Sequence, residues 1–243
     1  MKFNFNRQGI GWRVELLPHL QTRQFTYQFK DNHNLFLNGG LYQFGVWNGF
    51  SLQGLARIIK HINQVSPFEF NLKYYAFDVF TGMPKEENEP ENQIDEVGCF
   101  DLLDEYGVED LDEALELLED DVRYNLSRHS PLTFFPGLVE DTLTDELAQQ
   151  LVPASYVDMD MDIYTPTHIA LDWMFKHNLI VEGTIIGYDD WVQVQTLKTF
   201  EGGEARAHKE IFDKYNVSTI QLLETVNRGQ TAFLITSIGG INE

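Results

Sequence analysis

Two apolar segments of this chain each end in a run of aspartates, and this pattern constrains the fold more than any other feature. The segments cover residues 154–164 and 184–191. The aspartates at their ends are Asp158, Asp160, Asp162, Asp189 and Asp190. Ligands of open α/β sheets bind outside the carboxyl ends of the strands, so two neighbouring strands of this kind would bring these carboxylates into one crevice. Carboxylates that lie so near one another need a hard cation, a shared proton or a hydrogen-bonded partner.

Strand-like and helix-like segments alternate along the chain. Strands are expected at residues 35–45, 73–79, 132–135, 154–160 and 179–188, and helices at residues 51–62, 142–151, 167–177 and 204–215. Two further strands, 218–223 and 231–237, flank a turn-rich stretch and predict a hairpin. This order is typical of an α/β fold with a doubly wound, mostly parallel sheet and a C-terminal antiparallel hairpin.

The chain is expected to form a single domain over residues 1–243, because no linker rich in Pro, Gly or Ser divides it. Residues 1–34 are expected to be an N-terminal extension. Residues 85–130 are strongly acidic and contain leucines at helical spacing, at positions 111, 115 and 118. A solvated helix and loop would explain this stretch, and its place after the second strand also fits a lid over the site, so both interpretations stay open.

The charge balance argues against two classes of partner. The chain has 38 acidic and 17 basic residues and a formal net charge of -21. Nucleic acids and anionic membrane surfaces need basic patches, so neither is an expected partner. No stretch approaches the ~18 apolar residues of a membrane span, and the N-terminus lacks the apolar region of a signal peptide. The expected location is therefore the cytoplasm.

The turn after the first strand, residues 39–51, contains Gly45 and Gly49. Glycines here would let the backbone approach a ligand closely, and the following helix N-terminus favours an anion such as a carboxylate. The turn has neither the G-x-G-x-x-G dinucleotide pattern nor a P-loop. Asp78 ends the second strand, where a carboxylate suits the two hydroxyls of a ribose. A plain turn and a capping aspartate are the alternatives.

Five ordered motifs cover residues 40–191. They are YQFGVWNGFS at 42–51, FDVFTGMP at 77–84, GLVEDTL at 137–143, DMDIYTPT at 160–167 and DDW at 189–191. The set resembles the macrocin O-methyltransferase (TylF/MycF-like) family of class I S-adenosylmethionine-dependent methyltransferases, whose corresponding segments read FDSFEGLP, GxFxDTL, DxDxYxST and DDY. The family usually has Glu where Gln43 stands and Ser where Pro166 stands.

The resemblance implies a seven-stranded methyltransferase sheet, S-adenosylmethionine as cofactor and a divalent metal, usually Mg²⁺, that holds the acceptor hydroxyl. Carried over by position, Asp160, Asp189 and Asp190 would be the metal ligands and Asp162 the general base. The cofactor-binding residues would be Gln43, Gly45, Trp47, Gly49 and Ser51 along its methionine part, Asp78 at the ribose, and Glu140 or Asp141 near the adenine. The acceptor would be a small molecule, such as a sugar of a natural product, and the protein a homodimer or higher oligomer.

The chemistry explains why these residue types belong together. Methyl transfer needs donor and acceptor held at attack distance and a group that takes the acceptor's proton. A coordinated cation lowers the pKa of a hydroxyl, and Mg²⁺ prefers oxygen ligands. Two alternatives stay open: a metal-dependent hydrolase that uses the aspartates, and a binding protein that kept the methyltransferase fold without catalysis, with Gln43 as its mark.

Overall fold

The computed structural model describes residues 37–65, 69–93, 95–126, 130–193, 198–199, 202–225 and 229–241. The expected N-terminal extension, 1–34, lies outside the described residues, as do residue 94 and residues 127–129 of the acidic stretch. In the described part of the chain, no helix is both long enough and apolar enough to cross a bilayer.

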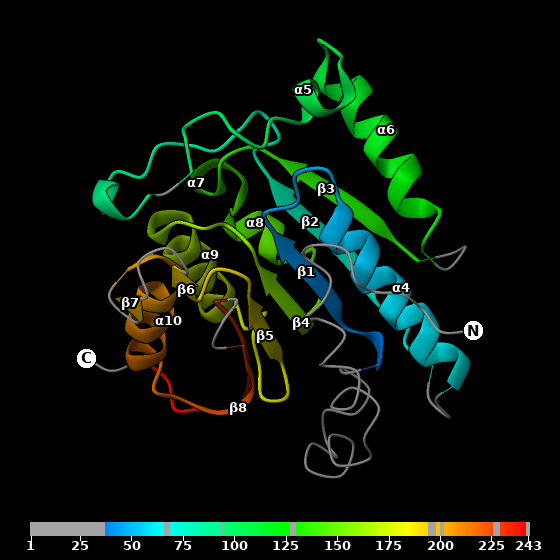
Figure 1. Cartoon of the computed structure of the whole chain (residues 1–243). Coiled ribbons are helices and arrows are strands. Elements are labelled where there is room, and N and C mark those ends of the chain that lie inside the picture. Colours follow the sequence, from blue (N-terminus) through cyan, green and yellow to red (C-terminus); the bar gives the residue numbers. More distant parts are fainter. Residues whose placement is uncertain are drawn as a thin grey trace.

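A seven-stranded sheet forms the centre of the molecule, in the order β3-β2-β1-β4-β5-β9-β8 (Figure 1). Its strands are β1 (Gly40–Phe44), β2 (Lys73–Asp78), β3 (Leu132–Pro136), β4 (Ala154–Met159), β5 (Ile185–Tyr188), β8 (Val217–Thr225) and β9 (Gln230–Ile238). The first five run parallel, and β9 is antiparallel to both β5 and β8. The predicted fold class is confirmed. The strand order reverses between β1 and β4, which is where ligands bind in such sheets.

Helices cover both faces of the sheet (Figure 1). One face carries α4 (Phe50–Val65), α5 (Leu102–Tyr106) and α6 (Leu111–Arg123), and the other carries α8 (Asp145–Ala148), α9 (Tyr164–Lys176) and α10 (Gly203–Lys214). Two short elements lie in the connections: a 3-10 turn at Pro90–Asn92 and α7 (Val139–Thr142).

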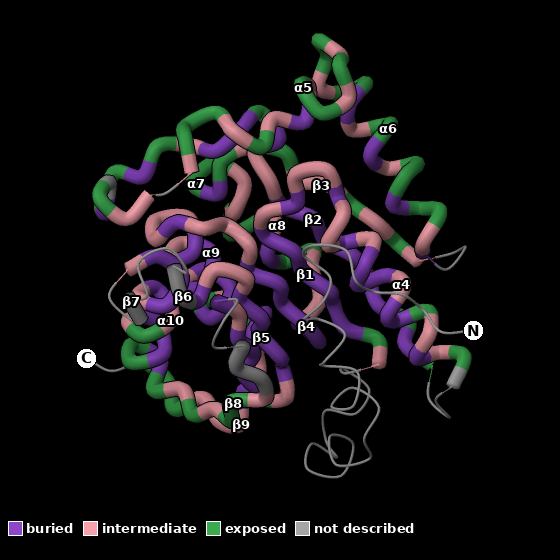
Figure 2. Tube along the Cα trace, in the orientation of Figure 1, coloured by how far each residue is buried: buried purple, intermediate pink, exposed green. Residues whose placement is uncertain are grey.

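The side chains of the central strands divide between two apolar cores. In β1, Leu41 packs into the core beneath α4 and α6, whereas Tyr42 and Phe44 pack into the core beneath α9 and α10. Figure 2 shows the central strands buried along their length. A parallel sheet covered on both faces has strands that read as continuous apolar runs, which explains why the sequence located them.

Several element boundaries differ from the prediction. The first strand begins at Gly40, because residues 37–38 are helical. The helix predicted over 142–151 is shorter in the structure: α7 ends at Thr142, and α8 covers only Asp145–Ala148, with Thr144 before it accepting a hydrogen bond from the Leu147 amide (3.1 Å). Helix α9 starts earlier than predicted, at Tyr164. Pro166 is tolerated there, since the first turn of a helix leaves its N–H groups unpaired.

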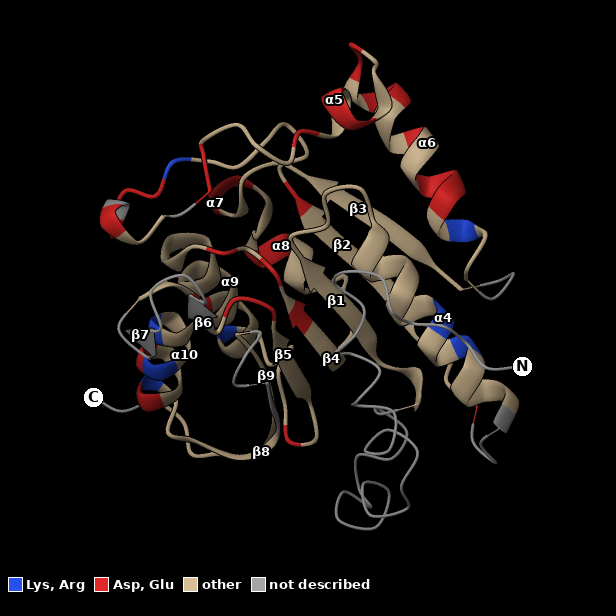
Figure 3. Cartoon of the chain, viewed as in Figure 1, with Lys and Arg blue, Asp and Glu red and all other residues tan. Residues whose placement is uncertain are grey.

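The acidic stretch contains a buried helix as well as solvated acids. Ala114, Leu118 and Val122 of α6 are fully buried in the core that α4 also forms. Figure 3 shows acidic residues along both α5 and α6. Helix α6 therefore forms part of the connection between the parallel strands β2 and β3, which a parallel pair requires.

Candidate active site

A cavity of about 1030 Å³ opens at the carboxyl ends of β1 to β5. Nine of the residues singled out from the sequence line it: Gly45, Trp47, Ser51, Asp78, Glu140, Asp160, Asp162, Asp189 and Asp190. Gln43, Gly49 and Asp141 are not among the lining residues. The structure therefore brings the aspartates, the glycine turn and the end of β2 into one hollow.

Asp78 holds the glycine turn in place. One of its carboxylate oxygens accepts hydrogen bonds from the Val46 and Trp47 amides, at 2.6 and 2.8 Å. The other accepts from the Phe80 amide, at 2.6 Å. Burial raises the pKa of Asp78, and these amides partly offset the effect. The side chain thus has a structural task, and its contact with a ribose stays a prediction.

The two glycines of the turn have packing roles. Gly45 has a φ of +80°, and a Cβ there would lie 1.6 Å from the Asp160 carbonyl oxygen. Gly49 has a φ of +70°, and its Cβ would lie 2.6 Å from Leu118 Cδ1 on α6. Gly45 lets the turn after β1 approach the loop after β4, and Gly49 lets α6 pack against the start of α4. Neither requires a ligand to explain it.

Gln43 is fully buried beneath the turn. Its Nε2 donates to the Gly45 carbonyl oxygen (3.0 Å) and to Ser51 Oγ. Its Oε1 has no hydrogen-bond partner among the described residues. The side chain thus links the end of β1 to the start of α4 and leaves one acceptor unused.

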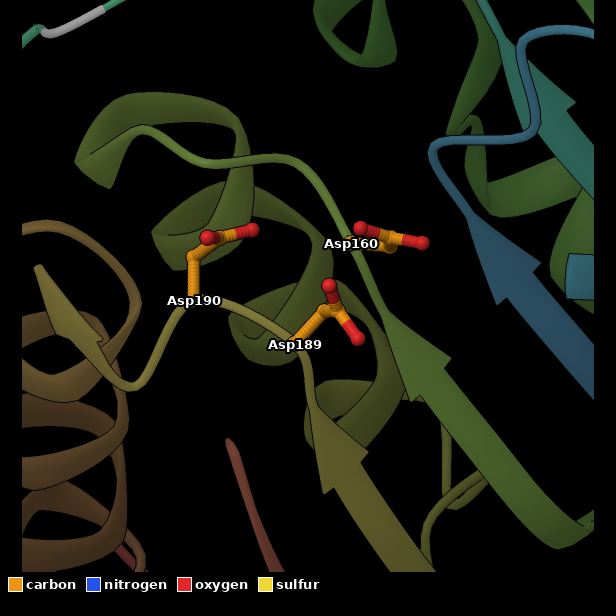
Figure 4. Close-up of side chains that lie close together, drawn as sticks. All are labelled: Asp160, Asp189 and Asp190. Atoms are coloured by element: carbon orange, nitrogen blue, oxygen red, sulfur yellow. The ribbon is translucent and has the colours of Figure 1, made fainter. Parts of the chain in front are cut away.

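Three aspartates form a compact cluster at the strand ends. Figure 4 shows Asp160 in the loop after β4 beside Asp189 and Asp190 in the loop after β5. One carboxylate oxygen from each lies within 4.8 Å of the others. The Asp160 amide bonds to the Phe44 carbonyl and the Asp189 amide to the Met159 carbonyl, so the sheet ladder itself positions both loops. Carboxylate oxygens are the ligands that Mg²⁺ prefers, so the donor set fits that ion.

Asp162 lies beside this cluster with a φ of 61°. Burial, reinforced by the nearby charge of Asp160, raises the pKa of Asp162 to about 8. Burial also raises the pKa of Asp190 well above its usual range, and the two carboxyl groups hydrogen-bond to each other. Two carboxyl groups in contact favour a shared proton, so this pair is expected to hold a proton at neutral pH. Asp158, by contrast, is fully buried in β4, where it accepts from the Tyr156 hydroxyl (2.8 Å).

Sequence reasoning missed a fully buried carboxylate, Glu204, in the first turn of α10. Its Oε1 accepts from the Met161 amide (3.0 Å) and its Oε2 from the Asp190 amide (3.1 Å). Acidic residues are common in a first helical turn, where they interact with the helix dipole, so the sequence position gave no sign of this contact.

Two further buried acids fasten residues 83–93, here named the strap, across the rim of the cavity. Glu86 and Glu89 are 1% and 2% exposed. Glu86 accepts from the Thr165 amide at the start of α9 (2.7 Å), and Glu89 accepts from the Gly203 amide at the start of α10 (2.9 Å). Met83, Pro84, Lys85 and Glu87 of the strap line the cavity. Glu86 and Glu89 therefore anchor the strap to the first turns of α9 and α10.

The strand order, the two helical layers and the cavity at the switch point define the fold of the class I methyltransferases. The structure of the O-methyltransferase NovP matches with a TM-score of 0.56 and 19% sequence identity, over 91% of this chain and 80% of that one. The structure of CalS11, a calicheamicin methyltransferase, matches with a TM-score of 0.54 and 17% identity, over 96% of this chain and 94% of that one. No protein-family model and no curated protein sequence matches the chain.

Proposed function

We propose that this protein is an S-adenosylmethionine-dependent, divalent-metal-dependent O-methyltransferase that acts on a hydroxyl of a small molecule, such as a sugar of a natural product. The observation that carries the proposal is the cluster of Asp160, Asp189 and Asp190 inside the cavity that the glycine turn also lines. The fold that the chain shares with NovP and CalS11 supports it.

The cofactor would lie along the ends of β1, β2 and β3. Gly45, Trp47 and Ser51 would hold its methionine part, Asp78 its ribose and Glu140 its adenine side, since all five line the cavity. Both residues are exposed, but Asp141 does not line the cavity, which favours Glu140 of the two. The unpaired Oε1 of Gln43 lies beneath the turn, so any contact with the cofactor's ammonium group requires a small movement of this turn. S-adenosylmethionine would supply an electrophilic methyl group.

The acceptor would lie over the aspartates. Asp160, Asp189 and Asp190 would hold the divalent cation, which would lower the pKa of an acceptor hydroxyl. Asp162 would take the hydroxyl proton, and a carboxylate whose pKa lies near neutrality is suited to that step. The strap and Phe100 would close the acceptor side against water, because they line the same cavity.

Calorimetric titration with S-adenosylhomocysteine, with and without Mg²⁺, tests the proposal. We expect binding in both conditions and a separate heat of Mg²⁺ binding. Metal binding without S-adenosylhomocysteine binding would instead support a metal-dependent hydrolase. S-adenosylhomocysteine binding without metal binding would leave a methyltransferase-fold binding protein as the better account.

A further inference from the structure

We infer that Glu204 is a positioning residue, which sets the separation of the metal-binding carboxylates by clamping the loop after β4 to the loop after β5. The inference rests on the proposed function, because it concerns the same metal site. Nothing in the resemblance to the macrocin O-methyltransferases assigns a role to this position.

The clamp is visible in two hydrogen bonds. The Met161 amide, which directly follows Asp160, donates to Glu204 Oε1, and the Asp190 amide donates to Glu204 Oε2. The distances are 3.0 and 3.1 Å. One side chain therefore spans the two loops that carry all three aspartates of the cluster.

A carboxylate suits this task better than other side chains do. It accepts on both oxygens, whereas an amide side chain has only one oxygen and presents N–H groups on its other side. In the described part of the chain, Glu204 forms no ion pair, although it is fully buried. Burying a carboxylate without a cation costs stability, so packing alone would favour an apolar residue here.

The first turn of α10 is itself held firmly. The Gly203 amide donates to Glu89 of the strap, and Arg206 forms an ion pair with the same carboxylate. Gly203 has a φ of +56°, and a Cβ there would lie 3.1 Å from the Asp162 carbonyl oxygen. The first turn of α10, which carries Glu204, therefore binds the strap on one side and packs closely against the loop after β4 on the other.

The first test compares metal affinity in Glu204→Gln and in the wild type, by calorimetric titration of Mg²⁺ and Mn²⁺. The glutamine oxygen can satisfy one of the two amides, and its NH₂ group would face the other. Changes in groups that orient metal ligands typically cost about 10–100-fold in metal affinity, and we expect a loss of that size. Binding of S-adenosylhomocysteine should stay unchanged, because the glycine turn is untouched.

Glu86→Gln is the matched control. It also removes a buried carboxylate that accepts an amide hydrogen at the start of a helix, but that helix is α9, and the Met161 and Asp190 amides both donate to Glu204 rather than to Glu86. We expect it to lower the melting temperature and leave metal affinity unchanged. Equal metal affinity in wild type and Glu204→Gln, or an equal loss in Glu204→Gln and Glu86→Gln, would overturn the inference.

Hydrogen exchange gives a second readout that does not depend on metal binding. The Met161 and Asp190 amides should be protected in the wild type, and at least one should exchange faster in Glu204→Gln. If the wild type binds neither Mg²⁺ nor Mn²⁺, the metal-dependent function fails, and hydrogen exchange alone decides whether the clamp exists. Unchanged protection of both amides would then overturn it.

Discussion

At the scale of single residues, the site is made of acids whose tasks differ although they lie close together. Asp160, Asp189 and Asp190 each place one carboxylate oxygen within 4.8 Å of the others. Asp78 accepts amide hydrogens from the glycine turn, and Glu204 accepts them from the loops after β4 and β5. The sequence shows the charge of each acid, but it does not show whether the acid contacts other carboxylates or accepts hydrogen bonds from backbone amides.

Asp160→Asn tests the ligand assignment. The amide keeps the size of the side chain and removes its charge, so the fold and S-adenosylhomocysteine binding should survive while Mg²⁺ affinity falls. Calorimetry of both ligands on the same preparation checks this expectation. Asp172→Asn is a suitable control, since Asp172 pairs with Lys214 on α10, away from the cavity lining. Unchanged Mg²⁺ affinity in Asp160→Asn would remove Asp160 from the ligand set.

Gly45→Ala tests the close approach of the turn to the loop after β4. The new Cβ would meet the Asp160 carbonyl oxygen at 1.6 Å, and the backbone would keep a positive φ. Gly107→Ala is the control, because Gly107 has a φ of +67° with nothing within 4 Å of its Cβ position. Strained φ values cost about 1–3 kcal/mol, so both variants should lose that much stability, and Gly45→Ala should lose clearly more. Equal losses in the free energy of unfolding of Gly45→Ala and Gly107→Ala, measured by chemical denaturation, would show that the close approach to the Asp160 carbonyl oxygen is unimportant.

At the scale of elements, the strap turns an acidic loop into a fixed rim. Glu86 fastens it to the start of α9 and Glu89 fastens it to the start of α10. The helix starts offer unpaired backbone N–H groups, and carboxylates satisfy them. The rim of the cavity is therefore held by α9 and α10, the helices that come after the clustered aspartates along the chain.

Glu86→Gln tests this anchoring. The Thr165 amide and hydroxyl and the Asn88 amide all donate to Glu86, and the glutamine cannot accept all of them. Unsatisfied buried donors cost about 1–3 kcal/mol each, so the variant should be less stable and its strap should exchange amide hydrogens faster. Glu87→Gln is the control, since Glu87 is exposed and its ion pair, among the described residues, is with the exposed Lys85. Amide hydrogen exchange of the strap that is equally slow in Glu86→Gln and Glu87→Gln would show that Glu86 does not anchor the strap.

Sequence patterns located most elements because a buried parallel strand or an amphipathic helix leaves a local signature. The aspartate cluster was predictable for the same reason, since parallel strands bring their carboxyl ends together. Glu86, Glu89 and Glu204 were not, because their partners are backbone amides 79, 114 and 43 positions away along the chain. The small hairpin of β6 (Val192–Gln193) and β7 (Lys198–Thr199) was also missed, since two-residue strands carry too little pattern.

At the scale of the whole molecule, the raised pKa of Asp162 links stability to pH, and the proposed metal site would add a link to metal binding. The pKa of Asp162 is raised from its ordinary 3.8 to about 8 in the folded protein. The folded state therefore holds this proton more tightly than the unfolded state does. The contribution of Asp162 to the free energy of unfolding is fully present below about pH 4 and is lost as the pH rises to about 8.

Thermal unfolding at several pH values, with and without Mg²⁺, checks this coupling. When Asp162 loses its proton, its carboxylate repels the neighbouring carboxylates, and a bound cation would reduce this repulsion. The rise in melting temperature on adding Mg²⁺ should therefore be larger at pH 8.5 than at pH 6. In Asp162→Asn, which cannot titrate at this position, the pH dependence of the metal-free protein should be weaker between those two values. A rise in melting temperature on adding Mg²⁺ that is the same at pH 6 and pH 8.5 would contradict the assignment of a proton to Asp162.

The most direct test of the whole account is a crystal structure of the protein with Mn²⁺ and S-adenosylhomocysteine, in which anomalous scattering locates the manganese. The account predicts one manganese peak bound by oxygens of Asp160, Asp189 and Asp190, with S-adenosylhomocysteine along the glycine turn and its ribose at Asp78. Manganese away from these three aspartates, or S-adenosylhomocysteine absent from the cavity, would contradict it.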